Sequence, residues 1–388
     1  MVTRRGAARL RSGHPWVYRS DLKSTNHAGP GALVTVEDDH GNRIGTALYS
    51  TSSEIALRFL TSATVACEEE LLALVRERVR AALEYRRRVV EDSDACRLVF
   101  SEADGLPGLI VDRYNDVLSL QVLTQAMDQP AVKQTVVTVL TEALTPGSVV
   151  ERVDSRIREL EHLPAAAPGP LYGDKAHTVF TMNGVRFHYD ALAGQKTGAF
   201  LDPRENSAAA ARYARGEALD VFCYEGGFAL HLARSCDRVT GVDSSRAALE
   251  AAEQNAALNG MPEMEWIEAN AFDLLKDYAA AGRQYDTIVL DPPAFARSKR
   301  TLSSALRGYK ELNLRALKML RPGGLLVTCS CSYHVSEADF LAVLAAAAVD
   351  AHRTLRVLEK RGQAKDHPVV LTIPETGYLK CLLCHVSI

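Results

Sequence analysis

Hydrophobic and polar residues alternate with a different period in each part of the chain. Near the N-terminus the apolar residues form short alternating segments, 32–38 and 44–50, around the turn-forming sequence DDHGN at 38–42. Alternation with a period of two is typical of half-buried strands, and Asp, Gly and Asn favour a tight reversal between them. We therefore expect a small β-rich domain over residues 1–66.

The middle part combines a long helical pattern with strand patterns. Apolar positions recur at helical spacing from 68 to about 90, with arginines on the other face. Strands separated by tight turns are predicted within 98–124, followed by a helix over roughly 130–144 and a strand at 147–154. This order predicts an α+β domain over 67–181.

Strands and helices alternate regularly in the last part. A stretch rich in Pro, Ala and Gly at 163–176 is predicted to be a linker before it. Strands are predicted at 217–224, 238–243, 264–270, 285–293 and 323–331, with helices from about 227 and at 245–259, 271–281 and 304–320. Such alternation specifies a parallel sheet with helices on both faces and ligands beyond the carboxyl ends of its strands. We expect a Rossmann-like α/β domain over 182–388.

Composition narrows the function further. No apolar run of ~20 residues and no signal-peptide pattern is present, so we expect a cytoplasmic protein without a membrane partner. The 8 cysteines should then be thiols rather than disulfides. Cys381 and Cys384 have the C-x-x-C spacing but no second pair at a suitable distance, so no metal is expected. The net charge of -3 argues neither for nor against a nucleic-acid partner.

Strand ends in the last part carry residues suited to a nucleoside cofactor. Gly226 and Gly227 let the backbone approach a ligand where a helix begins, without forming the G-x-G-x-x-G dinucleotide motif. Asp243 stands where doubly wound folds place a carboxylate for the ribose hydroxyls. Asn270 and Ala271 offer an amide and a backbone N–H to an adenine edge.

The predicted fourth strand ends in Asp291, Pro292 and Pro293. The succession of Gly-Gly, Asp, Asn and Asp-Pro-Pro resembles the class I S-adenosylmethionine-dependent methyltransferases. The D-P-P-x-aromatic pattern is similar to members that act on a planar nitrogenous ring. Stiff proline backbone leaves carbonyls and Asp291 to accept hydrogen bonds from an exocyclic amine, and Phe295 is a candidate for stacking on the ring. The alternative is that the prolines only end the strand.

The predicted fifth strand should lie beside the fourth, which brings two cysteines near Asp291. C5 of a pyrimidine is not nucleophilic until a nucleophile adds at C6, and a cysteine thiolate suits that addition. A period of two places Cys329 and Cys331 on one face and does not choose between them. Cys331 is nearer the carboxyl end, where the pocket opens, so we expect it to be the nucleophile and Cys329 to pack. Free cysteines are often buried, so core packing of both is the alternative.

Several strings together resemble the bacterial 23S ribosomal RNA cytosine-5 methyltransferases of the RlmI type. They are GHPWVYRSD, SEADGLPGLIVDRY, AGQKTGAFLDPREN, LDVFCYEGGFALHLA, LDPPAF, SCS and DHPV, and they span essentially the whole chain. The resemblance implies an N-terminal PUA domain, a middle α+β domain that helps hold RNA and a Rossmann-like catalytic domain, with Cys331 as nucleophile. It implies cofactor contacts at Phe222, Tyr224, Gly226, Gly227, Asp243, Asn270, Asp291, Lys196, Thr197 and Phe200, and the strand-end pattern adds Ala271.

The expected reaction is methylation of C5 of a cytosine in 23S ribosomal RNA, with S-adenosylmethionine as methyl donor and Asp291 beside the nucleophile. Arg9, Arg11 and Trp16 are candidates for RNA contact, although Trp16 also suits a barrel core. Methylation of a guanine or adenine nitrogen and a non-catalytic RNA-binding assembly factor are the alternative functions. The sequence leaves the oligomeric state open, with a homodimer as one option, and it does not assign the base that removes the C5 proton.

Overall fold

The computed structural model describes residues 1–388 except 26, 193–198 and 297. The chain divides into two compact units. Unit 1 comprises Met1–Phe180, Tyr189–Ala199 and Lys365–Thr376. Unit 2 comprises Thr181–His188, Phe200–Ala364 and Gly377–Ile388.

Unit 1 begins with a four-stranded antiparallel sheet. Its order is β1 (Trp16–Tyr18), β4 (Ile55–Thr61), β3 (Arg43–Tyr49) and β2 (Leu33–Glu37), with the 3-10 helix η1 (Arg19–Asp21) after β1. The strands predicted around the 38–42 turn are confirmed. Helix α1 (Arg4–Arg11) was not predicted, because its arginines mask a short apolar face. The Thr3 side chain caps this helix by accepting a hydrogen bond from the Gly6 N–H.

The rest of unit 1 contains a five-stranded sheet and its helices. The strand order is β5 (Ala95–Phe100), β6 (Leu109–Tyr114), β7 (Val117–Val122), β8 (Ser148–Arg152) and β9 (Gly169–Gly173). The helices are α2 (Glu68–Val89), η2 (Ser101–Asp104), α3 (Pro130–Leu144) and α4 (Ser155–Leu160). The prediction that 163–176 is only a linker was wrong, because β9 pairs with β8 as an edge strand, where glycine and proline are tolerated.

Unit 2 is built on a seven-stranded sheet, joined to unit 1 in sequence by the β10 (His177–Met182) and β11 (Val185–Asp190) hairpin. Its order is β14 (Glu265–Glu268), β13 (Arg238–Asp243), β12 (Glu217–Val221), β15 (Tyr285–Leu290), β16 (Leu320–Ser330), β18 (Lys380–Ser387) and β17 (Thr354–Arg361). From β14 to β16 every pairing is parallel, which confirms that the fifth strand lies beside the fourth.

The expectation of a parallel sheet fails at one edge. Strand β18 is antiparallel to both β16 and β17. The described segment between β17 and β18 contains only the short η4 (Pro374–Thr376) and no crossover helix, and antiparallel neighbours need none.

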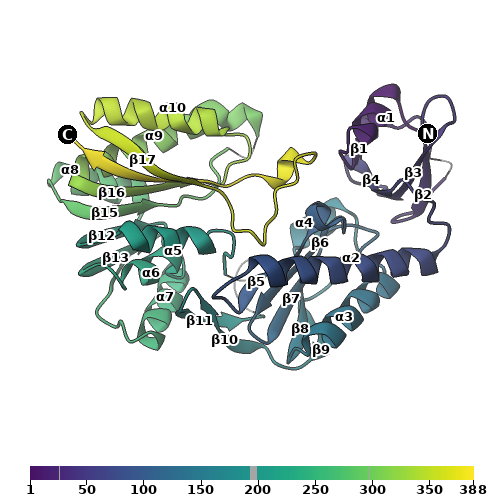
Figure 1. The fold of residues 1–388 in the computed structure, drawn as a ribbon, viewed down its shortest axis with the longest axis horizontal. Coiled ribbons are helices and arrows are strands. Elements are labelled where there is room, and N and C mark those ends of the chain that lie inside the picture. Colours follow the sequence, from purple (N-terminus) through teal and green to yellow (C-terminus); the bar gives the residue numbers. More distant parts are fainter. Residues whose placement is uncertain (26, 193–198, 297) are drawn as a thin grey trace. The chain divides into compact units, whose positions relative to one another are not determined.

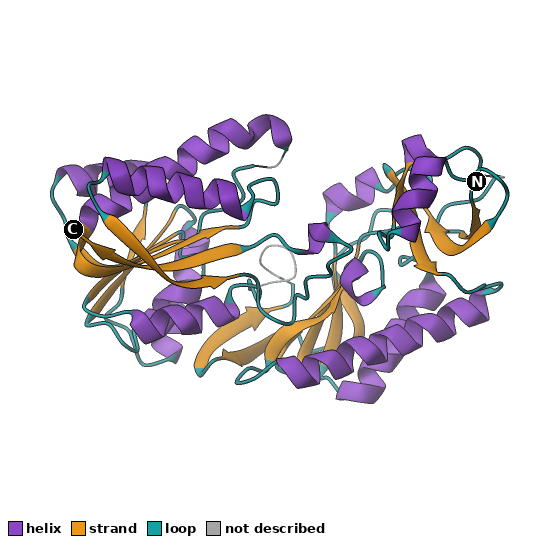
Figure 2. Ribbon diagram, turned by 45° about the horizontal axis from the view of Figure 1, so that its top comes forward, coloured by secondary structure: helices purple, strands orange, loops and turns teal. Residues whose placement is uncertain are grey.

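Helices cover both faces of the seven-stranded sheet (Figure 1). Figure 2 shows the strands in orange between the purple helices. One face carries α8 (Ala271–Ala280), α9 (Leu302–Met319) and α10 (Glu337–Asp350); the other carries α5 (Arg204–Tyr213), α6 (Gly227–Leu232) and α7 (Arg246–Leu258). A buried apolar cluster lies on each side. Because β12 to β16 run in one direction, the residues after their carboxyl ends gather at one edge.

None of the helices in the described ranges has both the length and the apolar character needed to cross a bilayer.

Candidate active site

The loop between β12 and α6 has an unusual backbone. Phe222, Tyr224 and Gly226 have φ values of 69°, 49° and 87°, in the left-handed region. Bulky residues rarely adopt this conformation, and such outliers cluster at functional sites. A Cβ atom added at Gly227 would meet no atom within 4 Å, so this turn leaves open space in front of α6. The loop can therefore bring its backbone close to a ligand.

The carboxylate of Asp243, at the end of β13, is held in one orientation. Its Oδ2 accepts a hydrogen bond from Tyr224 N at 3.0 Å, and its Oδ1 accepts one from Ser245 N at 2.9 Å. Each oxygen has lone pairs left for another donor. Asp243 is partly exposed, so these lone pairs are positioned to receive the hydroxyls of a ribose.

Two further carboxyl groups lie at this edge of the sheet. Burial, together with the charges of Asp291 and Asp243, raises the pKa of Asp220 to about 8, although Ala229 N donates to its Oδ2 at 2.8 Å. Its Oδ1 has no hydrogen-bond partner among the described residues. Burial, and then the charge of Asp202, raises the pKa of Asp291 to about 7. Desolvated carboxyl groups of this kind are characteristic of binding and catalytic sites.

Asn270 has a structural task that the sequence did not indicate. It is the N-cap of α8, and its Oδ1 accepts hydrogen bonds from Phe272 N at 2.9 Å and Asp273 N at 3.3 Å. Ala271 is buried as the first residue of the helix. The Asn270 side-chain NH₂ remains the donor available toward an adenine edge.

The fourth-strand motif follows β15 directly. Asp291 N donates to Val221 O at 3.3 Å, which joins the loops after β12 and β15. Pro292 is buried and Pro293 is exposed. The Phe295 ring is partly buried and lies 4.8 Å from the Tyr309 ring between centroids, packed against the core. Phe295 therefore has packing partners of its own beside any role in stacking on a base.

The two cysteines at the end of β16 have different surroundings. Cys329 is fully buried opposite Cys381 of β18. A hydrogen bond with Cys381, and then burial, raise the pKa of Cys329 well above its ordinary value, so that it stays a thiol. Cys331 lies just beyond the strand, is partly exposed, and donates from Sγ to Pro292 O at 3.6 Å. The accessible thiol is the one in contact with the Asp-Pro-Pro loop.

A buried hydrogen-bond network holds the Ser330–Ser332 segment around Cys331. The Tyr309 hydroxyl lies 3.0 Å from both Ser330 Oγ and Ser332 Oγ. Ser332 Oγ also accepts from Ala296 N at 3.1 Å. All these groups are buried, so the network fixes the turn that presents Cys331. Sequence periodicity gave no signal for Tyr309, because its partners lie more than twenty residues away.

The GQKTGAF string, residues 194–200, is described only in part. Lys196 and Thr197 lie outside the described residues. Phe200 is exposed, and its ring contacts the Tyr224 ring edge to face at a centroid distance of 5.1 Å. Asp202 Oδ2 accepts a hydrogen bond from the Tyr378 hydroxyl at 2.9 Å. Phe200 therefore lies beside the strained loop after β12.

The candidate RNA-contact residues of unit 1 lie apart in sequence from this site and have protein partners. Arg11 pairs with Asp38 at 2.6 Å, and the Arg9 guanidinium lies 4.7 Å from the centroid of the Tyr18 ring. Trp16 is half-buried. Its Nε1 donates to Oε1 of Glu102 in η2 at 3.0 Å.

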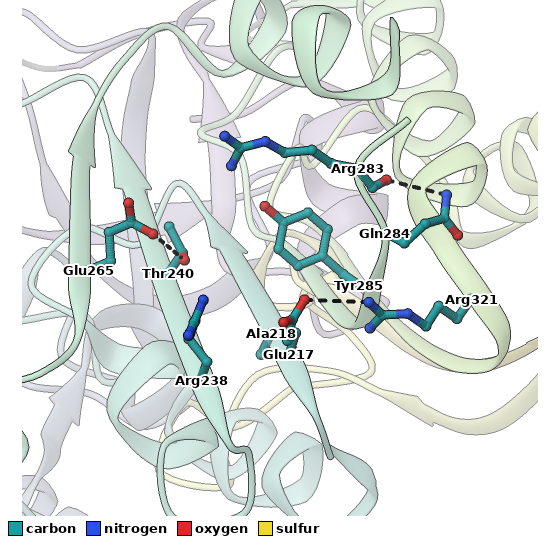
Figure 3. A pocket seen from close by; sticks show the side chains of 9 residues that line it. All are labelled: Glu217, Ala218, Arg238, Thr240, Glu265, Arg283, Gln284, Tyr285 and Arg321. Atoms are coloured by element: carbon teal, nitrogen blue, oxygen red, sulfur yellow. Dashed lines mark hydrogen bonds and ion pairs between the residues drawn. The ribbon is translucent and has the colours of Figure 1, made fainter. Parts of the chain in front are cut away.

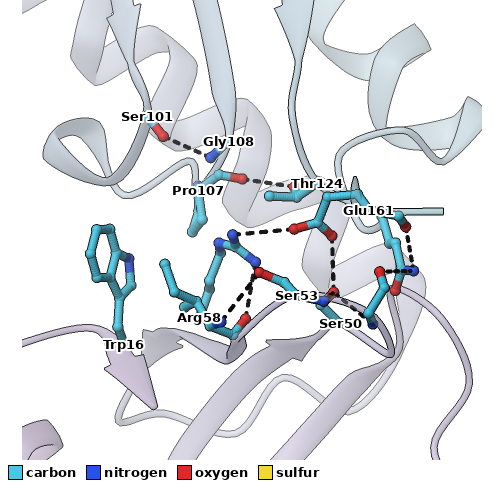
Figure 4. Close-up of polar contacts among 12 residues, drawn as sticks. Trp16, Ser50, Ser53, Arg58, Ser101, Pro107, Gly108, Thr124 and Glu161 are labelled. Carbon is cyan, nitrogen blue, oxygen red and sulfur yellow. Dashed lines mark hydrogen bonds and ion pairs between the residues drawn. The ribbon is translucent and has the colours of Figure 1, made fainter. Parts of the chain in front are cut away.

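Figure 4 shows Trp16 beside a group of polar contacts that includes Arg58, Ser50 and Glu161, where the four-stranded sheet meets the rest of unit 1. Arg58 lies 3.4 Å from Glu102 and 3.5 Å from Glu161, and Ser50 Oγ donates to Glu161 at 2.9 Å. The network ties β4 and the loop before it to η2 and to the residues after α4.

The opposite edge of the seven-stranded sheet contains a cavity of about 270 Å³ (Figure 3). Most of its lining residues are charged or polar and lie at or near the amino ends of the strands, and some of them have polar partners. Arg321 lies 2.7 Å from Asp286 and 3.5 Å from Glu217. Across the cavity, Thr240 Oγ1 donates to Glu265 at 2.9 Å. This cavity lies at the edge away from Cys331, Asp243 and Asp291.

The fold and the site together define a methyltransferase. Residues 104–384 match the family described as S-adenosylmethionine-dependent methyltransferase, and residues 1–62 match a PUA-like domain. The chain belongs to this methyltransferase family, and S-adenosylmethionine is its cofactor. The prediction of a Rossmann-like α/β fold with a PUA-like domain before it is confirmed.

Two relatives of known name resemble this chain over nearly the full length of both sequences. Ribosomal RNA large subunit methyltransferase I of Photobacterium profundum is 36% identical over 97% of this chain and 96% of its own. The protein of the same name from Shewanella denitrificans is 37% identical over 96% and 95%.

Solved structures extend the likeness in fold. A SAM-dependent methyltransferase of Streptococcus mutans has a TM-score of 0.82 at 18% identity and covers 99% of this chain and 100% of its own. SMU.776, solved as a complex with SAH, has a TM-score of 0.83 at 19% identity and covers 99% of both chains.

Proposed function

We propose that this protein methylates C5 of a cytosine in 23S ribosomal RNA through a covalent bond between Cys331 and C6 of the base. One observation carries the proposal: an accessible thiol contacts the Asp-Pro-Pro loop through Pro292 O at 3.6 Å. Methylation of a base nitrogen needs no thiol, because the nitrogen lone pair attacks the methyl group itself. The names of the full-length relatives support ribosomal RNA as the substrate.

The residues of the loop after β12 and the next two strand ends fit S-adenosylmethionine. We assign the ribose hydroxyls to Asp243, the adenine edge to Asn270 and Ala271, and the close backbone approach to Gly226 and Gly227. The unsatisfied Oδ1 of Asp220 fits an ammonium donor from the methionine part. Phe222, Tyr224, Phe200 and the loop residues Lys196 and Thr197 complete the proposed contacts.

The proposed reaction uses the different states of the two cysteines. The Cys331 thiolate donates an electron pair to C6, and the resulting negative charge makes C5 nucleophilic. Bound S-adenosylmethionine would supply the methyl group: its sulfonium S–CH₃ bond breaks as C5 forms the new C–CH₃ bond, and the electron pair stays on the sulfur of S-adenosylhomocysteine. Loss of the C5 proton to a base then restores the double bond, and the Cys331 sulfur leaves C6 with its electron pair. Cys329 stays protonated and packed.

Asp291, Pro292 and Pro293 are assigned to the target base. The raised pKa of Asp291, about 7, lets this side chain carry a proton or a negative charge near neutral pH. Either state makes a hydrogen bond with the polar edge of a cytosine. Arg9 and Arg11 supply positive charge for RNA phosphates, and Trp16 and Phe295 are the aromatic candidates for base contacts.

The test is nucleoside analysis of the product. The purified protein is incubated with labelled S-adenosylmethionine and unmodified 23S ribosomal RNA, and the labelled nucleoside is identified by mass spectrometry. We expect 5-methylcytidine from the wild type, a loss of at least about 10³-fold in Cys331→Ala, and retention in Cys329→Ala. A methylated guanine or adenine, or full activity of Cys331→Ala, would contradict the proposal. Absence of any cofactor binding would favour the assembly factor.

A further inference from the structure

Lys380 lies next to the proposed nucleophile although the two residues are 49 positions apart in sequence. It is the first residue of β18 and pairs in register with Ser330, the residue before Cys331. This pairing exists because β18 runs antiparallel beside β16. The lysine therefore starts at the same end of the sheet as the Asp-Pro-Pro loop.

The Lys380 ammonium is fixed by two backbone carbonyls. Nζ donates to Ser332 O at 2.7 Å and to Tyr378 O at 2.8 Å. The first carbonyl belongs to the residue directly after Cys331. An ammonium has three donors, and no third acceptor is present among the described residues. One N–H of a half-buried cation is thus left beside the Cys331 turn.

The electrostatics fit this geometry. Burial lowers the pKa of Lys380 to about 8, and the negative charge of a Cys331 thiolate acts in the opposite direction. Among the described residues, Tyr309 and Cys329 also interact with Cys331, and both have raised pKa values and remain neutral near pH 7. Lys380 therefore supplies a positive charge beside this thiol, whereas Asp291, in the loop that Cys331 contacts, supplies a negative charge when it ionises near pH 7.

We propose that Lys380 is a positioning residue that holds the Ser332 carbonyl and stabilises the thiolate of Cys331. This inference rests on the proposed function, since it concerns the same nucleophile. The Cys331 S–H bond breaks, its proton goes to solvent, and sulfur keeps the electron pair. Lys380 stays protonated and its charge offsets the new negative charge. No other bond changes before attack on the base.

The experiment measures the reactivity of Cys331 against pH in the full-length protein without RNA. Iodoacetamide reacts with thiolates, and peptide mass spectrometry resolves Cys331 from the other cysteines. We expect Lys380→Met to move the midpoint of Cys331 alkylation upward and to lower the rate about tenfold at pH 7. Near pH 10 the two rates should converge, because both proteins then hold a thiolate. Lys380→Arg, which keeps the charge, should stay close to the wild type.

A matched control is Lys276→Met, which removes an exposed ammonium from α8 and should leave the profile unchanged. Superimposable profiles of Lys380→Met and the wild type would overturn the proposal. An equal loss of rate at every pH would also overturn it, because that result reports accessibility rather than charge. A wild type that makes no 5-methylcytidine would defeat the proposed function and leave this profile unaffected.

A reciprocal measurement keeps the test independent of how Lys380→Met folds. Coupling between two charges acts equally on both partners. In Cys331→Ser the thiolate is absent, so the amine of Lys380 should acetylate with a midpoint at lower pH than in the wild type. An unchanged acetylation midpoint would contradict the proposal even where the lysine variants are unstable.

Discussion

Charged side chains at the two edges of the seven-stranded sheet have opposite environments. At the amino ends of the strands, Arg321 lies between Glu217 and Asp286, and the three side chains remain partly exposed. At the carboxyl ends, Asp220 and Asp291 are desolvated and form no ion pair among the described residues. The first arrangement stabilises weakly, and the second costs free energy when the carboxyl groups ionise.

This difference indicates that a ligand binds at the carboxyl-end edge, where its contacts can offset the cost of the desolvated carboxyl groups. A cavity of about 270 Å³ is present at the amino-end edge, but Arg321 there is already paired with Glu217 and Asp286. The carboxyl-end edge combines left-handed backbone, open space at Gly227 and an unsatisfied Asp220 oxygen. The carboxyl-end edge is therefore the better candidate for the ligand site, although the amino-end edge contains a cavity.

The largest expected effect in this comparison is at Asp243. Asp243→Ala removes the carboxylate proposed to accept the ribose hydroxyls, and two charge-assisted hydrogen bonds correspond to a loss of about 100-fold or more in cofactor affinity. Isothermal titration with S-adenosylmethionine measures it. The matched control is Glu217→Gln at the other end of the neighbouring strand, which should bind as the wild type does. Equal affinities for Asp243→Ala and Glu217→Gln would refute the assignment.

At Asp220 we expect an effect of intermediate size on how the free energy of unfolding depends on pH. Its pKa is raised to about 8 in the folded state, so the folded protein binds the proton more tightly than the unfolded chain. Stability is therefore lost as pH rises from about 4 to about 8. Asp220→Asn should remove this loss and raise the free energy of unfolding at pH 8 by at least about 2 kcal/mol, with little change at pH 4.

Urea unfolding of the cofactor-free protein at both pH values provides the measurement for Asp220→Asn. The matching carboxylate at the amino end, Asp286, pairs with Arg321, so Asp286→Asn should not stabilise the protein at pH 8. A difference between Asp220→Asn and the wild type that is the same at pH 4 and pH 8 would argue against a desolvated carboxyl group.

The smallest effect is expected at the amino-end cavity. Arg321 is 41% exposed, so its ion pairs are screened by solvent. Arg321→Met should change the free energy of unfolding by less than about 1 kcal/mol and leave cofactor affinity and methyl transfer unchanged. Thermal unfolding and the methyl-transfer assay check this. A tenfold loss of transfer would show that this edge takes part in function.

Local patterns predicted much of this organisation. Helical spacing from 68 to about 90 gave α2, and the alternation after residue 217 gave the strands from β12 to β16. Helix α1 was not predicted because its arginines obscure the apolar pattern of its buried face. Strand β9 was not predicted because glycine and proline are typical of linkers as well as of edge strands. These misses share a cause: tertiary partners stabilise both segments.

The sequence predicted only those candidate site residues that directly follow a predicted strand. Gly226, Asp243, Asp291 and Cys331 follow predicted strands, so the alternating pattern located them. Lys380 could not be found in this way, because its place depends on the antiparallel register between β16 and β18. The raised pKa values of Asp220 and Asp291 were equally hidden, since desolvation depends on packing from distant segments.

The most direct test of the account traps the proposed bond between Cys331 and the base. In 23S ribosomal RNA that contains 5-fluorocytidine, fluorine replaces the C5 proton, so the base cannot be released after methyl transfer. With S-adenosylmethionine present, we predict a denaturation-resistant protein–RNA complex whose mass maps to Cys331. It should form with Cys329→Ala and not with Cys331→Ala. Methylation of ordinary 23S RNA without any such complex, or a bond at another residue, would contradict the account.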